Sequence, residues 1–96
     1  MSIQKVNKWY IYITANWNRR VLYVGKTNNL RRRLLEHEAD AQGEKKTFAG
    51  RYNCYHLLYY EKQQTAKQAT AREKEIKGWS RIKKQILING NCEGGN

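Results

Sequence analysis

WYIYITANWNRRVLYVGKTNNLRRRLLEH, residues 9–37, contains the two short apolar runs that determine the fold of this chain. The first run, WYIYIT at 9–14, alternates large apolar side chains with tyrosines, and this period of two predicts a β-strand. The second run, VLYVGK at 21–26, has the same character, and the polar segment between the runs is short enough for a turn. The stretch therefore predicts an antiparallel β-hairpin.

Strand and helix signals continue after the hairpin. A third run, CYHLLYYE at 54–61, predicts another strand, and the polar segment QGEKKTFAG at 42–50 before it predicts a loop. Threonine, asparagine and serine residues precede three further segments, where their side chains can accept hydrogen bonds as helix N-caps. The expected helices run from Thr27 or Asn28 to about Ala41, from Thr65 to about Lys77, and from Ser80 over 81–88.

The chain has 96 residues, which suits a single domain, and its 40% of hydrophobic residues can form a modest core. We expect a polar lead-in at 1–8, one domain at 9–90 and a flexible tail at 91–96. The elements follow the order β-β-α-β-α-α, which packs most simply as a small three-stranded antiparallel sheet flanked by helices. The predicted fold class is therefore α/β in the broad sense and α+β in the narrower one.

Positive charge is the strongest signal in the composition. Lysine and arginine number 19 against 8 aspartates and glutamates, and the resulting net charge of +11 is spread over both halves of the chain. This excess indicates a polyanionic partner, with nucleic acid first and a basic surface that has no such partner as the alternative. No segment has the length of a membrane span or the form of a signal peptide, so we expect a cytoplasmic protein that does not bind membranes.

Arg33 and His37 interrupt the apolar stripe of the first expected helix. Leu30 and Leu34 define its inner face, and Arg33 and His37 lie within or beside that face by helical spacing. An arginine at such a position needs an anion, or else it lies at the edge of the stripe and extends to water. The helix pattern alone leaves both alternatives open.

Glu73 is the corresponding anomaly in the second expected helix. It shares the inner face with Ala69 and Ile76, whereas Glu75 falls off that face. An inward carboxylate in a basic protein suits a metal ion or an arginine partner. A structural Glu73–Arg33 ion pair is therefore the alternative to a metal site.

Tyr12 and Tyr23 are expected on one side of the hairpin. In each strand the aliphatic side chains share one face, so the tyrosines project from the opposite face when the aliphatic faces pack together. Ordinary aromatic packing is the alternative explanation for tyrosines in strands.

Taken in order, these residues resemble the GIY-YIG nuclease family. The YIY of residues 10–12 matches the family's first motif, with tyrosine in place of the leading glycine, and the YVG of residues 23–25 matches the second. KTNNLRRRLLEH then supplies Arg33 and His37 at the family's spacing, and AREKEIKGW supplies Glu73. The resemblance covers nearly the whole chain and is closest to short stand-alone members, which are related to the N-terminal catalytic domain of the excision-repair nuclease.

The resemblance implies a divalent-metal-dependent endonuclease that hydrolyses phosphodiester bonds, most often in DNA. It implies that Tyr12 acts as a base or positions water, which requires a depressed phenol pKa, and that Tyr23 hydrogen-bonds near the scissile phosphate. Arg33 would hold the phosphate and offset charge in the transition state, and His37 would assist the phosphate or position a tyrosine. Glu73 would hold one Mg²⁺ or Mn²⁺ ion. Further substrate contacts are assigned to Lys26, Arg31, Arg32 and Asn89.

Two other functions stay open at this point. The chain could be a non-catalytic nucleic-acid-binding module that keeps the same fold, or a protein-interaction domain whose basic surface is incidental. A nuclease of this size has no room for a separate specificity domain, so we expect weak, unselective binding unless a partner protein, a dimer or a structured substrate adds specificity. The resemblance favours DNA over RNA and leaves repair, restriction and mobile-element roles open.

Overall fold

The computed structural model describes residues 8–94, with side chains described up to residue 90. The predicted lead-in at 1–8 lies outside this range except for Lys8, and so do residues 95 and 96 of the predicted tail. The elements along the chain are β1 (Trp9–Ala15), β2 (Leu22–Thr27), α1 (Leu30–Gln42), α2 (Phe48–Arg51), β3 (His56–Gln63), α3 (Ala66–Lys77) and α4 (Arg81–Gly94).

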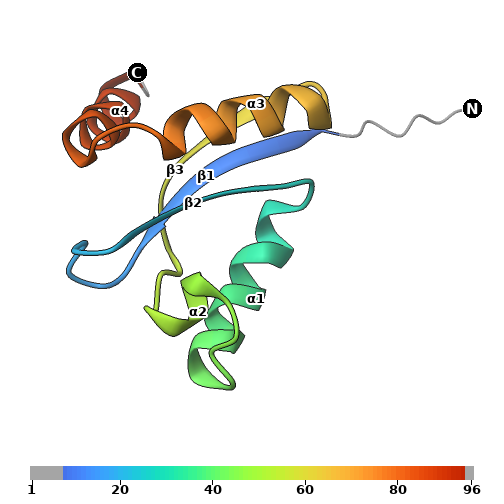
Figure 1. Ribbon diagram of the computed structural model, residues 1–96, viewed down its shortest axis with the longest axis vertical. Coiled ribbons are helices and arrows are strands. Elements are labelled where there is room, and N and C mark those ends of the chain that lie inside the picture. Colours follow the sequence, from blue (N-terminus) through green and yellow to red (C-terminus); the bar gives the residue numbers. More distant parts are fainter. Residues whose placement is uncertain (1–7, 95–96) are drawn as a thin grey trace, which may run out of the picture.

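The three strands form one antiparallel sheet in the order β2-β1-β3, so β2 and β3 are its edges. Figure 1 shows α3 along one face of the sheet and α1 with α2 on the opposite side, while α4 follows at the end of α3. The predicted fold, a three-stranded antiparallel sheet flanked by helices, is confirmed. None of the helices within residues 8–94 has both the length and the apolar character needed to cross a bilayer.

The strand register separates the aliphatic side chains from the tyrosines. Ile13 pairs with Val24 and Tyr12 with Gly25, so alternate residues of the hairpin face opposite sides of the sheet. The aliphatic side packs against α3 and α4 to form the core. The buried core residues are Ile11, Ile13, Val24, Tyr59, Ala69, Ile76 and Ile88. The register places Tyr12 and Tyr23 together on the other side, as expected.

The start of α1 differs from the prediction because of local hydrogen bonds. Asn29, rather than Thr27 or Asn28, is the N-cap, since its side chain accepts a hydrogen bond from the Arg32 N–H at 3.0 Å. The Thr27 hydroxyl oxygen instead accepts from the Asn29 N–H at 3.1 Å. Thr27 therefore ends β2 and positions the cap without being the cap itself.

The segment predicted as a loop at 42–50 contains most of α2. This helix has 4 residues, too few for a periodic sequence signal, and it is fixed by Thr47 as its N-cap. The N–H of Cys54 donates to the Ala49 carbonyl at 2.7 Å. Cys54 is thereby bound to α2 and not to the sheet, so β3 begins later than the predicted residue 54.

α4 continues to Gly94, well beyond the predicted end at residue 88, and residues 91–94 of the expected tail are helical. Asparagine and glycine are weak helix formers, which is why the sequence predicted an earlier end. Ile88, at the predicted end of the helix, is 2% exposed and anchors α4 on the core. The backbone therefore stays helical past Ile88 despite the weak local propensity of the residues that follow.

A cluster of polar side chains holds α3 against β3. Nε of Arg72 lies 2.7 Å from Oε2 of Glu61, and the Tyr59 hydroxyl donates a hydrogen bond to the same carboxylate. The Arg72 guanidinium also lies 5.2 Å from the ring centroid of Trp79. Burial raises the pKa of Glu61, but the hydrogen bonds from Arg72 and Tyr59 outweigh it and lower the pKa overall.

We expect Glu61→Gln to lower the free energy of unfolding by about 1–3 kcal/mol at pH 7, because it removes the charge from a partly buried pair. The folded-state pKa of Glu61 lies below its ordinary value of 4.5. Its contribution is therefore present above pH 4.5 and is lost as the pH falls through the folded-state value. Urea unfolding between pH 3 and 7 checks this, with exposed Glu38→Gln as the control. A difference from wild type that does not shrink at low pH would contradict it.

Candidate active site

Tyr12 and His37 form a buried hydrogen bond at the centre of the candidate site. The Tyr12 hydroxyl oxygen lies 2.8 Å from Nε2 of His37, and the two residues are 1% and 3% exposed. Tyr12 comes from the middle of β1, and His37 from the apolar stripe of α1. The histidine that interrupts the stripe therefore has its partner on the sheet.

Burial sets the protonation states of this pair. It raises the pKa of Tyr12 well above the usual range, with help from Tyr23, and the positive charge of Arg33 only partly opposes the rise. Burial, together with Arg33, lowers the pKa of His37. Both groups are neutral near pH 7, and Nε2 of His37 accepts the Tyr12 hydroxyl proton in the tautomer that carries its own proton on Nδ1. In this structure the pKa of Tyr12 is therefore raised and not depressed, because the loss of solvent outweighs the nearby charge of Arg33.

Gly25 makes room for the Tyr12 side chain. A Cβ atom at this position would lie 2.5 Å from the Tyr12 hydroxyl oxygen and 2.8 Å from the ring of Tyr23. The rings of Tyr12 and Tyr23 have centroids 6.0 Å apart, and the Tyr23 ring meets the imidazole of His37 edge-on at 5.3 Å. The glycine of the YVG motif thus lets three ring side chains gather above β2.

We expect Gly25→Ala to lower any activity of this site by about 100-fold, because a displacement of about 1 Å in reacting groups has an effect of that order. The added methyl group has no free space and must push Tyr12 or Tyr23 aside. Gly90→Ala is the matched control, since a Cβ atom there has nothing within 4 Å. Cleavage rates and melting temperatures of the two variants check the expectation. Equal rates in both variants would show that Gly25 does not position Tyr12.

Glu73 is held between two lysines on the other side of β2. Its carboxylate lies 3.5 Å from Nζ of Lys26 on β2 and 3.1 Å from Nζ of Lys77 one turn along α3. The Glu73 side chain is 16% exposed, as the inward position on the helix predicted. Nζ of Lys77 also lies 5.9 Å from the ring centroid of Tyr23. Lys77 therefore contacts both Glu73 on one face of β2 and Tyr23 on the opposite face.

Part of the candidate site thus lies at the edge strand β2, while Tyr12 lies on the central strand β1. Tyr23 and Lys26 point to opposite faces of β2, and β2 has a neighbour on one side only. Groups from both faces can approach each other around such an edge, which is how the Lys77–Tyr23 contact forms. Tyr12 responds to the charges of both Arg33 and Glu73, although burial remains the largest influence on its pKa.

Arg33 lies at the exposed border of this cluster. It pairs with Glu36 at 3.1 Å, and within residues 8–94 no ion pair joins it to Glu73. Glu73 has Lys26 and Lys77 as its partners, so the alternative of a structural Arg33–Glu73 pair is wrong. The Arg33 side chain is 44% exposed, so its guanidinium is accessible to an anion.

The other predicted substrate contacts are less closely connected to the cluster. Arg32 is exposed on α1, and Arg31 lines a separate open pocket of about 550 Å³ together with Tyr10 and Tyr60. Asn89 is exposed on α4, and in the described part of the chain no hydrogen bond or ion pair connects it to the cluster. Among the four predicted substrate-binding residues, Lys26 alone forms an ion pair with a predicted catalytic residue, Glu73.

Phe48 and Asp40 are the neighbours that the sequence prediction missed. The Phe48 ring stacks on Tyr23, with centroids 5.9 Å apart and an interplanar angle of 25°. Asp40 accepts hydrogen bonds from the Lys46 and Thr47 N–H groups and from the Thr47 hydroxyl, which fixes α2 beside α1. A threonine before an apolar residue is the one local signal for α2, and it is too common to predict a single turn of helix.

The Glu73 carboxylate fits a hard divalent cation. Mg²⁺ is commonly held by one or two carboxylates, with water and substrate phosphate as the remaining ligands. Among the described residues no group of three or more histidine, cysteine, aspartate or glutamate side chains could hold a metal ion by itself. The site therefore suits an ion that arrives with a phosphate, and Lys26 and Lys77 neutralise the carboxylate in its absence.

Comparisons with known proteins agree with this geometry. Residues 8–85 match the model of the GIY-YIG catalytic domain. A UPF0213 protein of Desulfotalea psychrophila is 33% identical over 86 residues, which cover 90% of this chain and 76% of that protein. A UPF0213 protein of Natronomonas pharaonis is 34% identical over 79 residues, which cover 82% of this chain and 88% of that protein. The solution structure of a UPF0213 protein from Bacillus halodurans superimposes with a TM-score of 0.52 at 28% identity, over 85% of this chain and 83% of that chain.

Proposed function

Because this chain belongs to the GIY-YIG family, whose domain is that of a nuclease, we propose that it is a divalent-metal-dependent endonuclease that hydrolyses phosphodiester bonds, with DNA as the favoured substrate. The observation that carries the proposal is the buried Tyr12–His37 hydrogen bond, which lies beside Tyr23. Lys77, which pairs with Glu73, lies near the same Tyr23 ring. The net charge of +11 supports a polyanionic substrate.

The tyrosine–histidine pair would move the proton of the attacking water. Tyr12 is too weak an acid to act as a phenolate, but neutral His37 can accept its proton through Nε2. As the water oxygen bonds to phosphorus, the Tyr12 hydroxyl takes a proton from the water and passes its own proton to His37. The bond from phosphorus to the leaving oxygen breaks, and the leaving alkoxide takes a proton from bulk water. The imidazolium of His37 then returns its proton to solvent, so that one water is consumed overall.

The charged groups around the pair would hold the phosphate. Arg33 would bind its oxygens and offset their charge in the transition state, and Tyr23 would hydrogen-bond beside it. Lys26 and Lys77 would turn from the carboxylate to the phosphate when substrate binds. Glu73 would hold one Mg²⁺ or Mn²⁺ ion, which supplies charge stabilisation for the leaving oxygen.

The test is incubation of the purified protein with supercoiled plasmid in Mg²⁺, in Mn²⁺ and in EDTA. Nicking that requires the metal is the expected result, and its rate should fall steeply as salt rises because phosphate contacts release counterions. Salt-dependent gel shifts without nicking under any condition would reject catalysis and support the binding module. Parallel assays with duplex, branched and single-stranded DNA and with RNA would identify the substrate class.

A further inference from the structure

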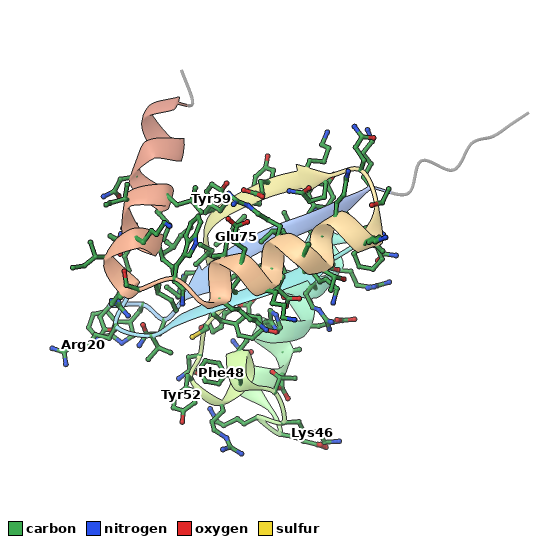
Figure 2. The ribbon with its side chains drawn as sticks, turned by 45° about the horizontal axis from the view of Figure 1, so that its top comes forward. Arg20, Lys46, Phe48, Tyr52, Tyr59 and Glu75 are labelled. Carbon is green, nitrogen blue, oxygen red and sulfur yellow. The ribbon has the colours of Figure 1, made fainter. Side chains whose placement is uncertain are left out.

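Two exposed aromatic rings extend the candidate site outward along α2. Phe48 stacks on Tyr23, and Tyr52 packs on Phe48 with ring centroids 4.8 Å apart. Phe48 is 50% exposed and Tyr52 is 44% exposed, so both side chains are accessible to solvent beside the site. Figure 2 shows the two side chains next to each other on the part of the molecule below the sheet. We call Phe48 and Tyr52 the α2 platform.

We propose that the α2 platform binds an unpaired base of the nucleic-acid substrate next to the scissile phosphate. The inference rests on the proposed nuclease function and adds a substrate class to it: nucleic acid with single-stranded, bulged or extruded bases near the cut. Aromatic side chains stack on every base through its π-face, so the platform confers preference for unpaired structure and not for sequence. Bases inside a duplex are already stacked on their neighbours and cannot occupy it without extrusion.

The platform is held rigidly before any ligand binds. Asp40 of α1 accepts hydrogen bonds from the Thr47 N–H at 2.8 Å, the Lys46 N–H at 2.9 Å and the Thr47 hydroxyl at 2.8 Å. The hydrogen bonds from the Thr47 and Lys46 amides lower the pKa of Asp40, so the carboxylate stays charged at neutral pH. At Gly50 a Cβ atom would collide with the Asp40 side chain. A preformed surface loses less entropy on binding than a flexible one.

Charge around α2 favours a base over an apolar peptide as the occupant. Arg51 is exposed on the same helix, and among the described residues it forms no ion pair with a carboxylate. Lys77, close to Tyr23, adds a second cation at the inner end of the stack. Phosphates on either side of a stacked base would therefore meet positive charge, in a chain whose net charge is +11.

Binding measurements separate this inference from the proposed catalytic function. Fluorescence anisotropy in Mg²⁺ would compare a duplex, the same duplex with a single-nucleotide bulge, and a single strand, all with the Glu73→Gln protein to prevent cleavage. We expect the bulged and single-stranded probes to bind about tenfold more tightly than the duplex, the size expected for one stacked base. Phe48→Leu and Tyr52→Leu should each remove most of that difference. Tyr60→Leu, which changes a ring that is also 50% exposed on β3, should leave it unchanged.

Replacement of the bulged base by an abasic site completes the design. The abasic probe should bind the Glu73→Gln protein no better than the duplex, and Phe48→Leu should make no further difference. Tyr52→Leu alters only the outer ring, so it tests the platform even if Phe48→Leu disturbs Tyr23. Retained binding with the same probe preference in both platform variants, or an equal loss in Tyr60→Leu, would overturn the inference and leave the nuclease proposal standing. Absence of both binding and plasmid nicking in the wild type would overturn both.

Discussion

Glu73→Gln is expected to reduce metal-dependent nicking by about 1,000-fold or more. An amide keeps the size of the side chain but lacks the charge that holds a divalent ion, and charge stabilisation by such an ion amounts to several kcal/mol. The melting temperature should change little, because the substitution removes only the ion pairs with Lys26 and Lys77, and the Lys77 side chain is 51% exposed.

Glu75→Gln is the matched control for this prediction. Glu75 lies two residues further along α3, and its side chain is 54% exposed. It pairs with Arg72 and not with the lysines that contact Glu73. Figure 2 shows Glu75 on the same helix, in the direction of Tyr59. The control variant should nick plasmid at the wild-type rate. Isothermal titration with Mn²⁺ in the presence of uncleaved DNA would show whether Glu73→Gln no longer binds the ion. Full activity in Glu73→Gln would remove Glu73 from the mechanism.

Tyr12→Phe is expected to lower the nicking rate by about 100- to 10,000-fold, the range typical of removing a group that transfers a proton. The ring remains over Gly25, but the variant cannot pass a proton from water to His37. The buried imidazole is also left without its hydrogen-bond partner, so the free energy of unfolding should fall by about 1–3 kcal/mol. Single-turnover rates at saturating protein separate this effect from weakened binding.

The pH dependence of nicking identifies the partner of Tyr12. His37 must be neutral to accept the proton, and burial with Arg33 lowers its pKa below the ordinary 6.5. Wild-type activity should therefore hold at pH 6.5 and fall as the pH drops through the lower folded-state value. Tyr10→Phe, two residues away on the same strand, should keep both the rate and this profile. A Tyr12→Phe protein as active as Tyr10→Phe would exclude the proton relay.

Sequence patterns predicted the hairpin, the sheet and the inward positions of His37 and Glu73 because these follow from short-range periodicity. A period of two along β1 and β2 is sufficient to place Tyr12 and Tyr23 on one side. Likewise, a helical period shows that Glu73 shares a face with Ile76. These predictions need no knowledge of distant contacts.

The features that the sequence did not predict depend on contacts between distant segments. The need for Gly25 arises from Tyr12 on the neighbouring strand, and the partners of Glu73 depend on where Lys26 meets α3. The raised pKa of Tyr12 follows from its burial, and the number of charged residues near it in the sequence does not predict how deeply the hydroxyl is buried. α2 is held in place by hydrogen bonds from Thr47 to Asp40 of α1, and the helix is too short to show a periodic sequence pattern.

The position of β2 at the sheet edge connects activity to local opening of the fold. An edge strand is bonded to one neighbour only, and such strands exchange their amide protons with solvent before the centre of a sheet does. Tyr23, Gly25 and Lys26 all belong to β2, so a brief detachment of this strand removes Tyr23 from the Tyr12–His37 pair and Lys26 from Glu73. Inactivation on warming should therefore precede global melting, and ligands that close over the edge should slow hydrogen exchange in β2 first.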